Sequence, residues 1–399
     1  MQMNKKHFFE NIRRQNSKLL SGLMTSSLAI SVTMLAGCNL STSSSSSCNP
    51  GSLSSLDSAK AGSTQYLKKA LVTTTENIII PSYQEFDTRA KSFQTSVDAF
   101  CSARTEPNLQ QAQNDWKALS EQWNKVALYN LSAPLSPINN DEFTPLINRI
   151  DRSIFLKGAD ETSSTQTAIN DLMASSSTLN DSYFESLRTK DLDLVGLLAL
   201  EILLFEDLTG AHSTNGADIV NSYTDRKCDY LKGVAGDFQR TTQTIVTGWT
   251  DSFNGGDAFK DAFAWCELDN GAEPIAELIV SIQTYLNFYK DKKILATSTL
   301  GSSIADNFYG DMTATLDELE LLLEGKNDSD VSFFDQMQAR GATQDIDTIK
   351  ENLAEARAAV TAENLANLDL AIGKLDGNIK REFADGLGVV LGVNFADGD

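Results

Sequence analysis

The stretch LVGLLALEILLFED, residues 194–207, is an almost unbroken run of apolar residues with one carboxylate, Glu201, in its middle. Its leucine and alanine content favours a helix that is apolar on all sides and is therefore buried. A buried carboxylate is strongly unfavourable unless it is paired, protonated or bound to a ligand. The stretch thus predicts a helical core in which some other group compensates Glu201.

The rest of the chain follows the same helical pattern. Only 7 of its 399 residues are proline, and apolar residues recur every three or four positions between short turns. This spacing predicts helices rather than strands. The expected helices cover about residues 64–103, 107–128, 191–205, 218–249, 257–290, 304–324, 346–360 and 363–386.

Proline and tryptophan positions refine two of these helices. Pro107 suits a first helical turn, whereas Pro81 is expected to break or kink the helix that contains it. Trp116 and Trp123 fall on the apolar face of the helix over residues 107–128, so we expect both in the core.

The polar stretch TGAHSTNGAD, residues 209–218, separates two halves that each hold about four substantial helical segments. Two packed helical bundles are the economical arrangement for this pattern. We therefore expect an all-α fold with an N-terminal bundle over residues 59–212 and a C-terminal bundle over residues 213–399. No clear sequence identity relates the two halves.

The N-terminus has the features of a bacterial lipoprotein leader. Basic residues precede an apolar run that ends in LAGC, where Cys38 would carry the lipid. We expect a signal peptide over residues 1–37 and a serine-rich tether over residues 38–58. Because Asn39 rather than aspartate follows Cys38, an enterobacterial-type sorting system would place the protein at the periplasmic face of the outer membrane. The alternative is an ordinary secretory signal without lipid.

The chain is strongly acidic, with 33 basic and 54 acidic residues and a formal charge of −21. Loss of the basic leader would make the remainder still more acidic. This balance argues against binding to nucleic acid or to an anionic lipid surface. It is compatible with cation binding, although a solvated acidic surface explains it equally.

Beyond Cys38 the chain has four cysteines: Cys48, Cys101, Cys228 and Cys266. An even number in an oxidising compartment indicates disulfides, and three pairings are open. We favour Cys228 with Cys266, within the second half, and Cys48 with Cys101, which would tie the linker to the first half. The sequence has no CxxC motif and only His212 beyond the leader, which argues against a structural zinc site.

Common catalytic signatures are absent from the sequence. It contains no HExxH zinc motif, no GxSxG nucleophile motif, no Walker loop and no dinucleotide fingerprint after a strand. A serine hydrolase triad would depend on His212 alone.

Several segments in order resemble the imelysin-like family, bacterial periplasmic or lipid-anchored proteins linked to iron uptake and historically described as peptidases. GLLALEILLF lies where the family has its G-x-H-x-x-E motif, and KKILATSTLG is similar to the family's Lys-Leu and Pro-Leu-Gly stretch. The tryptophan helix and the ending LGVNFADGD also resemble the family. The resemblance covers about residues 63–399 and implies two helical bundles related by duplication, with the motif near the cleft between them.

The motif is degenerate in this chain. Gly196 and Glu201 match it, but Leu198 stands where the family has histidine. Histidine and glutamate three residues apart on a helix can ligate one metal, whereas leucine cannot. The family's acidic residue after the tryptophan is replaced by Ala127. Two possible ligands are therefore missing.

Two interpretations of Glu201 stay open. In the first, Glu201 is structural and is paired with an arginine such as Arg149 or Arg152, or accepts hydrogen bonds. In the second, Glu201 is a remaining metal ligand with Asp191 and Asp193. Oxygen ligands of this kind suit iron or another divalent or trivalent cation better than zinc.

The sequence therefore predicts a lipid-anchored periplasmic protein of the imelysin-like type, without catalytic activity, that acts as a binding or accessory component of iron or metal acquisition. Its expected partners are the membrane, through the lipid, and either iron or another envelope protein, but not nucleic acid. The alternatives are an imelysin-type metallopeptidase and an envelope adaptor.

Overall fold

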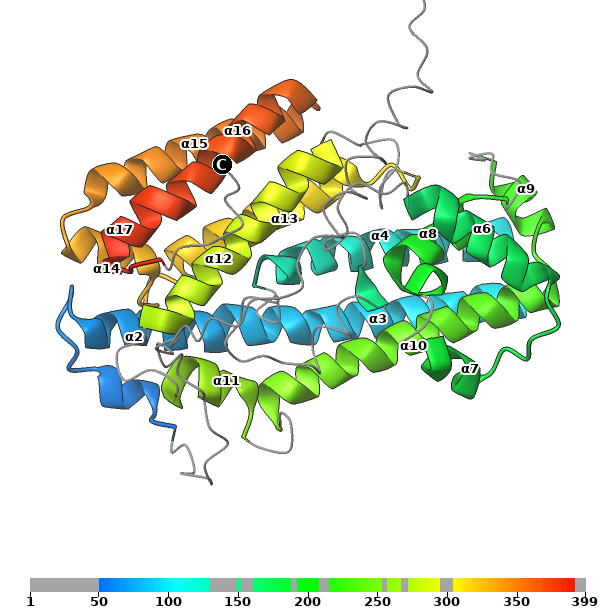
Figure 1. Cartoon of the computed structure of the whole chain (residues 1–399), viewed down its shortest axis with the longest axis horizontal. Coiled ribbons are helices and arrows are strands. Elements are labelled where there is room, and N and C mark those ends of the chain that lie inside the picture. The colour runs from blue at the N-terminus through cyan, green and yellow to red at the C-terminus, as the bar shows by residue number, and fades with distance from the viewer. Residues whose placement is uncertain are drawn as a thin grey trace, which may run out of the picture. The chain divides into compact units, whose positions relative to one another are not determined.

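In the part of the chain that the computed structural model describes, every regular element is a helix, which confirms the all-α prediction (Figure 1). The structure describes residues 50–129, 149–151, 161–187, 192–207, 215–252, 257–266, 272–294 and 304–391. Within these ranges, no helix combines the length and the apolar character that a bilayer span requires.

One group of helices is built on three long ones that lie side by side: α3 (Ile80–Ser102), α4 (Glu106–Val126) and α10 (Asp225–Thr250). The shorter members around them are α6 (Glu161–Ala174), α7 (Asp181–Ser186), η6 (Leu192–Leu194), α8 (Gly196–Phe205), α9 (Gly216–Asn221), α11 (Phe259–Asp261) and the π-helix η7 (Ala262–Cys266).

The second group contains α12 (Ala272–Phe288), the π-helix η8 (Tyr289–Ile294), α13 (Phe308–Glu324), α14 (Phe333–Ala339), α15 (Thr343–Thr361), α16 (Leu365–Asn378), the π-helix η9 (Ile379–Phe383) and α17 (Ala384–Leu387). Helices α15 and α16 pair with each other, and α13 packs on α4 of the first group (Figure 1). Short elements complete the fold: η1 (Leu53–Leu56), α2 (Thr64–Thr74), the π-helix η2 (Thr75–Ile79) and η3 (Ala127–Tyr129).

The two groups are not separate bodies, since Ser47–Asp399 forms one compact unit. The division of the sequence at residues 212 and 213 stays a prediction, and α10, which begins after it, packs along α3. The duplication also stays a prediction.

The prolines act at the starts of helices. Pro107 lies in the first turn of α4, as expected, where its missing N–H removes no helical hydrogen bond. Pro81 lies in the first turn of α3, directly after the π-helical turn η2. Pro274 occupies the same kind of position in α12.

Helix α8 is held by side chains of the neighbouring long helices. Trp116 of α4 donates its indole N–H to the Leu197 carbonyl at 3.2 Å, and Tyr230 of α10 donates its hydroxyl to the Leu194 carbonyl at 2.8 Å. Trp116 and Trp123 are both buried, which confirms the core prediction. These bonds attach the start of α8 to α4 and to α10.

Gly196 allows the chain to enter α8. Its φ is +85°, a conformation that residues with a side chain rarely adopt. A β-carbon here would lie 2.6 Å from the Arg149 carbonyl oxygen and 2.7 Å from that of Ile150. Glycine is therefore required both by the backbone angle and by the close approach of residues 149 and 150.

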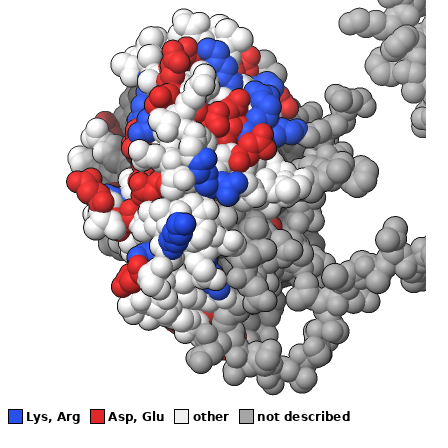
Figure 2. Space-filling view, turned by 90° about the vertical axis from the view of Figure 1, so that its left-hand side faces the viewer, with Lys and Arg blue, Asp and Glu red and all other residues white. Residues whose placement is uncertain are grey.

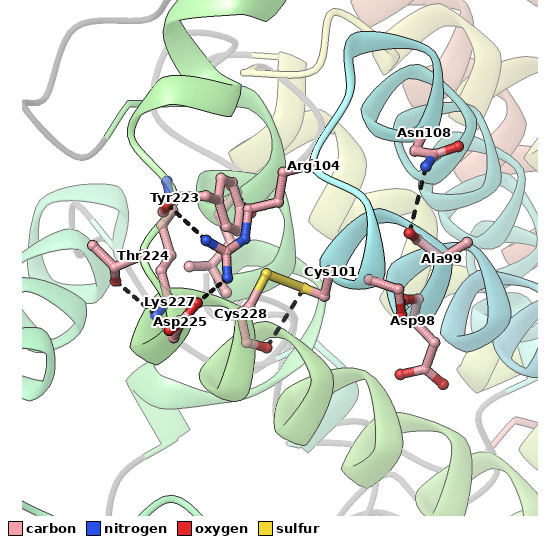
Figure 3. The surroundings of a disulfide bond; sticks show 12 residues. Asp98, Ala99, Cys101, Arg104, Asn108, Tyr223, Thr224, Asp225, Lys227 and Cys228 are labelled. Carbon is pink, nitrogen blue, oxygen red and sulfur yellow. Dashed lines mark hydrogen bonds and ion pairs between the residues drawn. A yellow bond between two sulfur atoms is a disulfide. The ribbon is translucent and has the colours of Figure 1, made fainter.

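The disulfide pairing predicted from the sequence is wrong. Cys101, at the end of α3, is bonded to Cys228, in the first turn of α10, with their Cα atoms 5.5 Å apart (Figure 3). Neither Cys228–Cys266 nor Cys48–Cys101 can form together with this bond. The prediction assumed pairing within each half, but α3 and α10 pack along each other and bring cysteines 127 residues apart into contact.

Polar contacts surround this disulfide. Arg104 donates to the Tyr223 carbonyl at 3.4 Å and forms an ion pair with Asp225 (Figure 3). Lys227, only 1% exposed, donates to the Ser222 hydroxyl at 2.9 Å and lies 4.1 Å from the centre of the Tyr223 ring. Burial lowers the pKa of Lys227 to about 7, although Asp207 and Glu206 act in the opposite direction.

The surface charges are mixed on the face that Figure 2 shows, where acidic and basic side chains are interspersed rather than gathered by sign. Exposed ion pairs occur among the C-terminal helices, where Lys374 pairs with Glu355 at 2.5 Å and Lys350 with Glu324 at 2.9 Å. Exposed pairs of this kind contribute little to stability. Surface charge on this face therefore points to no particular macromolecular partner.

The disulfide is expected to stabilise the fold. Replacing Cys101 with serine should lower the free energy of unfolding by about 3 to 5 kcal/mol in the chain-entropy model, because the bond closes a long loop. Urea denaturation measures this loss, and Cys228→Ser should match it. Non-reducing peptide mapping that joined Cys101 to Cys48, or Cys228 to Cys266, would contradict the pairing.

Lys227 should make stability depend on pH. Its pKa in the folded protein, about 7, lies below that of an unfolded lysine, so the unfolded chain binds more protons between these values. The wild-type free energy of unfolding should therefore rise, relative to that of Lys227→Met, by roughly 3 to 5 kcal/mol from pH 7 to about pH 10.5. Below pH 7 the difference between the two proteins should be constant. Parallel urea-denaturation profiles across this range would show that the buried amine is not responsible.

Candidate functional site

Glu201 is completely buried in the middle of α8. Its Oε1 accepts a hydrogen bond from the backbone N–H of Ala305 at 2.8 Å. Ala305 lies in the turn before α13, so this bond connects the two groups of helices. Glu201 is thus engaged by the protein itself, as the structural interpretation requires.

The expected pairing of Glu201 with Arg149 is wrong. Arg149 is buried and forms its ion pair with Asp237 of α10. Burial raises the pKa of Asp237, and the charge of Arg149 opposes that effect. Arg152, the other suggested partner, lies outside the described residues.

A lysine is buried close to Glu201. Lys293, in the π-helix η8, is 4% exposed and donates to Asn124 Oδ1 of α4 at 3.1 Å. Tyr285 and Tyr289 donate their hydroxyls to the same oxygen, each at 2.5 Å. These three donors are spaced four residues apart, so one face of α12 and η8 presents all of them to Asn124.

Two further carboxylates belong to this cluster, one from α13 and one from residue 151. Asp311 is completely buried and accepts from Ser120 Oγ and from Asn307 Nδ2, both at 3.1 Å. Asp151 accepts from the indole N–H of Trp123 at 3.0 Å. We call Glu201, Lys293, Asn124, Tyr285, Tyr289, Asp311 and Asp151 the interior polar cluster.

The interior polar cluster raises the pKa of Lys293. Burial acts to lower the pKa of Lys293, but neighbouring acidic groups outweigh it and raise the pKa above the ordinary value. These groups, in order of effect, are Tyr289, Asp311, Asp151 and Glu201. Burial raises the pKa of Tyr289 to about 12, and the charge of Lys293 acts in the opposite direction.

This arrangement does not suit Lys293 to acid–base catalysis. A lysine acts as a general base only when its pKa approaches the working pH. The groups around Lys293 move its pKa the other way, which argues against a role as a general base. Lys293 supplies the positive charge that the buried carboxylates need.

The residues of this cluster do not fit a metal ion. Leu198, at the position of the missing histidine, is half-buried among apolar side chains. Among the described residues, no three histidine, cysteine or acidic side chains lie close enough to hold an ion. Lys293 donates to the amide oxygen of Asn124 within the same cluster.

Of the other proposed ligands, Asp193 is half-buried and accepts from Ser164 Oγ at 3.5 Å. Asp191 lies outside the described residues, as do Cys38 and Cys48, and the side chain of Cys266 is not described. Ala127, where the family has an acidic residue, is a buried apolar residue in η3.

Sequence reasoning missed Lys293, Asn124 and Asp311. Lys293 is part of KKILATSTLG, and the spacing of Tyr285, Tyr289 and Lys293 is a signal that could have shown a shared face. No local pattern distinguishes Asn124 or Asp311, because their contacts join helices that are distant in the sequence.

Comparison with known proteins identifies the family and supports the fold. The family model described as Peptidase_M75, Imelysin, matches residues 79–384. Among solved structures, an imelysin-like protein from Psychrobacter arcticum 273-4 has a TM-score of 0.51 at 15% identity, covering 83% of this chain and 98% of that one. A putative iron-regulated protein A precursor from Parabacteroides distasonis ATCC 8503 has a TM-score of 0.58 at 14% identity, with coverage of 82% and 97%. No curated protein matches the sequence.

Removing the buried ammonium should destabilise the protein strongly. Lys293→Met leaves buried carboxylates without their positive charge, and we expect a loss of about 3 to 5 kcal/mol in the free energy of unfolding. Lys374→Met is the matched control, because Lys374 is half exposed in a surface pair and should contribute less than about 1 kcal/mol. Urea denaturation of both variants measures the two losses in the free energy of unfolding. Equal losses would contradict the compensating role of Lys293.

Proposed function

Since the chain belongs to the imelysin family, we propose that it is a non-catalytic, lipid-anchored accessory component of iron or metal acquisition in the bacterial envelope. The observation that carries the non-catalytic part is the interior polar cluster. At the motif position Leu198 replaces the histidine, and Lys293 supplies the positive charge near Glu201.

The ligand supply argues against zinc hydrolysis. A catalytic zinc takes three protein ligands and keeps an open position for water. Here Glu201 accepts from the Ala305 amide, and His212 is the only histidine beyond the proposed leader. A metallopeptidase, the alternative function, would need ligands that this cluster lacks.

The link to iron rests on likeness to the family and to one structural neighbour, which is described as a putative iron-regulated protein. The acidic composition supports a cationic cargo over an anionic one, with iron or another divalent or trivalent cation as the substrate class. Such an ion would be cargo, held elsewhere than in the interior polar cluster or passed to an envelope partner.

The location rests on the N-terminal sequence. The basic residues, the apolar run and LAGC support removal of residues 1–37 and attachment of lipid to Cys38. The serine-rich tether would then connect the outer membrane to the helical body on its periplasmic side.

One experiment in the bacterium that makes the protein tests these elements together. Deleting the gene should slow growth only when iron is scarce, and the wild-type gene should restore it. Cys38→Ser should not incorporate labelled fatty acid and should fail to restore growth. If the deletion strain grows normally when iron is scarce, the proposed role in iron acquisition is wrong. If Cys38→Ser still incorporates the labelled fatty acid, the proposed lipid anchor at Cys38 is wrong.

A parallel assay with purified protein tests the alternative. Unfolded protein substrates should remain intact with and without added zinc. Glu201→Gln should lower the free energy of unfolding by about 1 to 3 kcal/mol, because a charged hydrogen bond is lost. Zinc-stimulated cleavage that Glu201→Gln abolishes without a change in stability would establish the peptidase instead.

A further inference from the structure

A second polar site lies on the other face of α4 from Asn124. It is a cavity of about 310 Å³ between η2, α3, α4 and α13. Asn124 faces the interior polar cluster, whereas its neighbours Gln122 and Lys125 line this cavity. The volume is at the lower end of the range for small-molecule sites, which excludes large cofactors.

The deepest group that lines the cavity is a glutamate. Glu318 of α13 is 1% exposed, and its Oε1 accepts from Ser82 Oγ at 2.6 Å and from the Tyr129 hydroxyl at 2.7 Å. Both hydrogen bonds use the same oxygen, Oε1, and Glu318 is one of the residues that line the cavity. Burial raises the pKa of Glu318, while Lys125 and Lys326 act to keep it charged. A cation in the cavity would stabilise the ionised form further.

Positive charge gathers toward the outside of the same cavity. Lys125 is half-buried and Lys326 is exposed, and both line the cavity. Neither forms an ion pair with the residues that the structure describes, whereas the lining residue Glu85 is already paired with Arg89 at 2.7 Å. The cavity therefore offers one buried carboxylate and two ammonium groups closer to solvent.

We propose that this cavity binds a small zwitterion, a molecule with one ammonium and one carboxylate group such as a free α-amino acid. The ammonium group of the ligand donates to the Glu318 carboxylate, and the carboxylate of the ligand pairs with Lys125 and Lys326. A simple anion would meet Glu318 at the base of the cavity, and a simple amine would meet the two lysines. Only a molecule that carries both charges satisfies both ends.

Isothermal titration calorimetry on the purified protein tests this inference, which is independent of any role in iron uptake. The probes are the twenty amino acids individually, with ethylamine and acetate as ligands that carry only one of the charges. At least one amino acid should bind, and both single-charge probes should bind at least about tenfold more weakly. If no amino acid binds, or if ethylamine or acetate binds as tightly, the inference is wrong.

Variants locate the binding. Glu318→Gln should weaken binding of the amino acid at least about tenfold, because it removes the buried charge but keeps the shape. Glu324→Gln is the matched control on α13, since Glu324 is exposed and lies outside the cavity lining. It should bind like the wild type. The joint change of Lys125 and Lys326 to methionine avoids the buried position and should weaken binding equally. Unaltered affinity in either of the two cavity variants would overturn the proposal.

Discussion

The buried carboxylate of Glu201 is the constraint on which the arrangement of helices depends. Helix α8 is apolar on nearly every side, so Glu201 has no solvent to accept its charge. The groups that compensate the buried carboxylate lie later in the sequence. They are the Ala305 amide and the side chain of Lys293. The contacts of these groups join α12, η8 and α13 to the first group of helices. Asn124 of α4 lies where they meet.

This constraint also explains how the family motif can lose its histidine. A site that uses histidine and glutamate for a metal has its charge balanced by that metal. In this chain Leu198 cannot bind metal, and a lysine ammonium provides the charge instead. The result is an interior in which buried polar side chains bond to one another across helices. Any ligand would then bind elsewhere, as in the cavity beside Glu318.

Local sequence patterns predicted the elements well. The apolar run predicted α8, and Pro107 predicted the start of α4. The spacing of Trp116 and Trp123 predicted that both lie in the core. The partners of buried charges were not predictable in this way. Arg149 and Cys101 pair with residues of α10 that lie 88 and 127 positions away, and Lys293 meets Asn124 across 169 positions. Helix periodicity shows which face is buried, but it does not show which distant helix covers that face.

The most direct test of the account is the protonation state of Lys293. Carbon-13 labelling of lysine side chains, with Lys293→Met to assign the signal, allows its pKa to be followed by nuclear magnetic resonance. The account predicts that the Lys293 signal shows a charged amine throughout the neutral range and titrates above the ordinary lysine pKa of about 10.4. A Lys293 that loses its proton near neutral pH would contradict the account, because Glu201 and its neighbours would then lack the positive charge that holds them in the core.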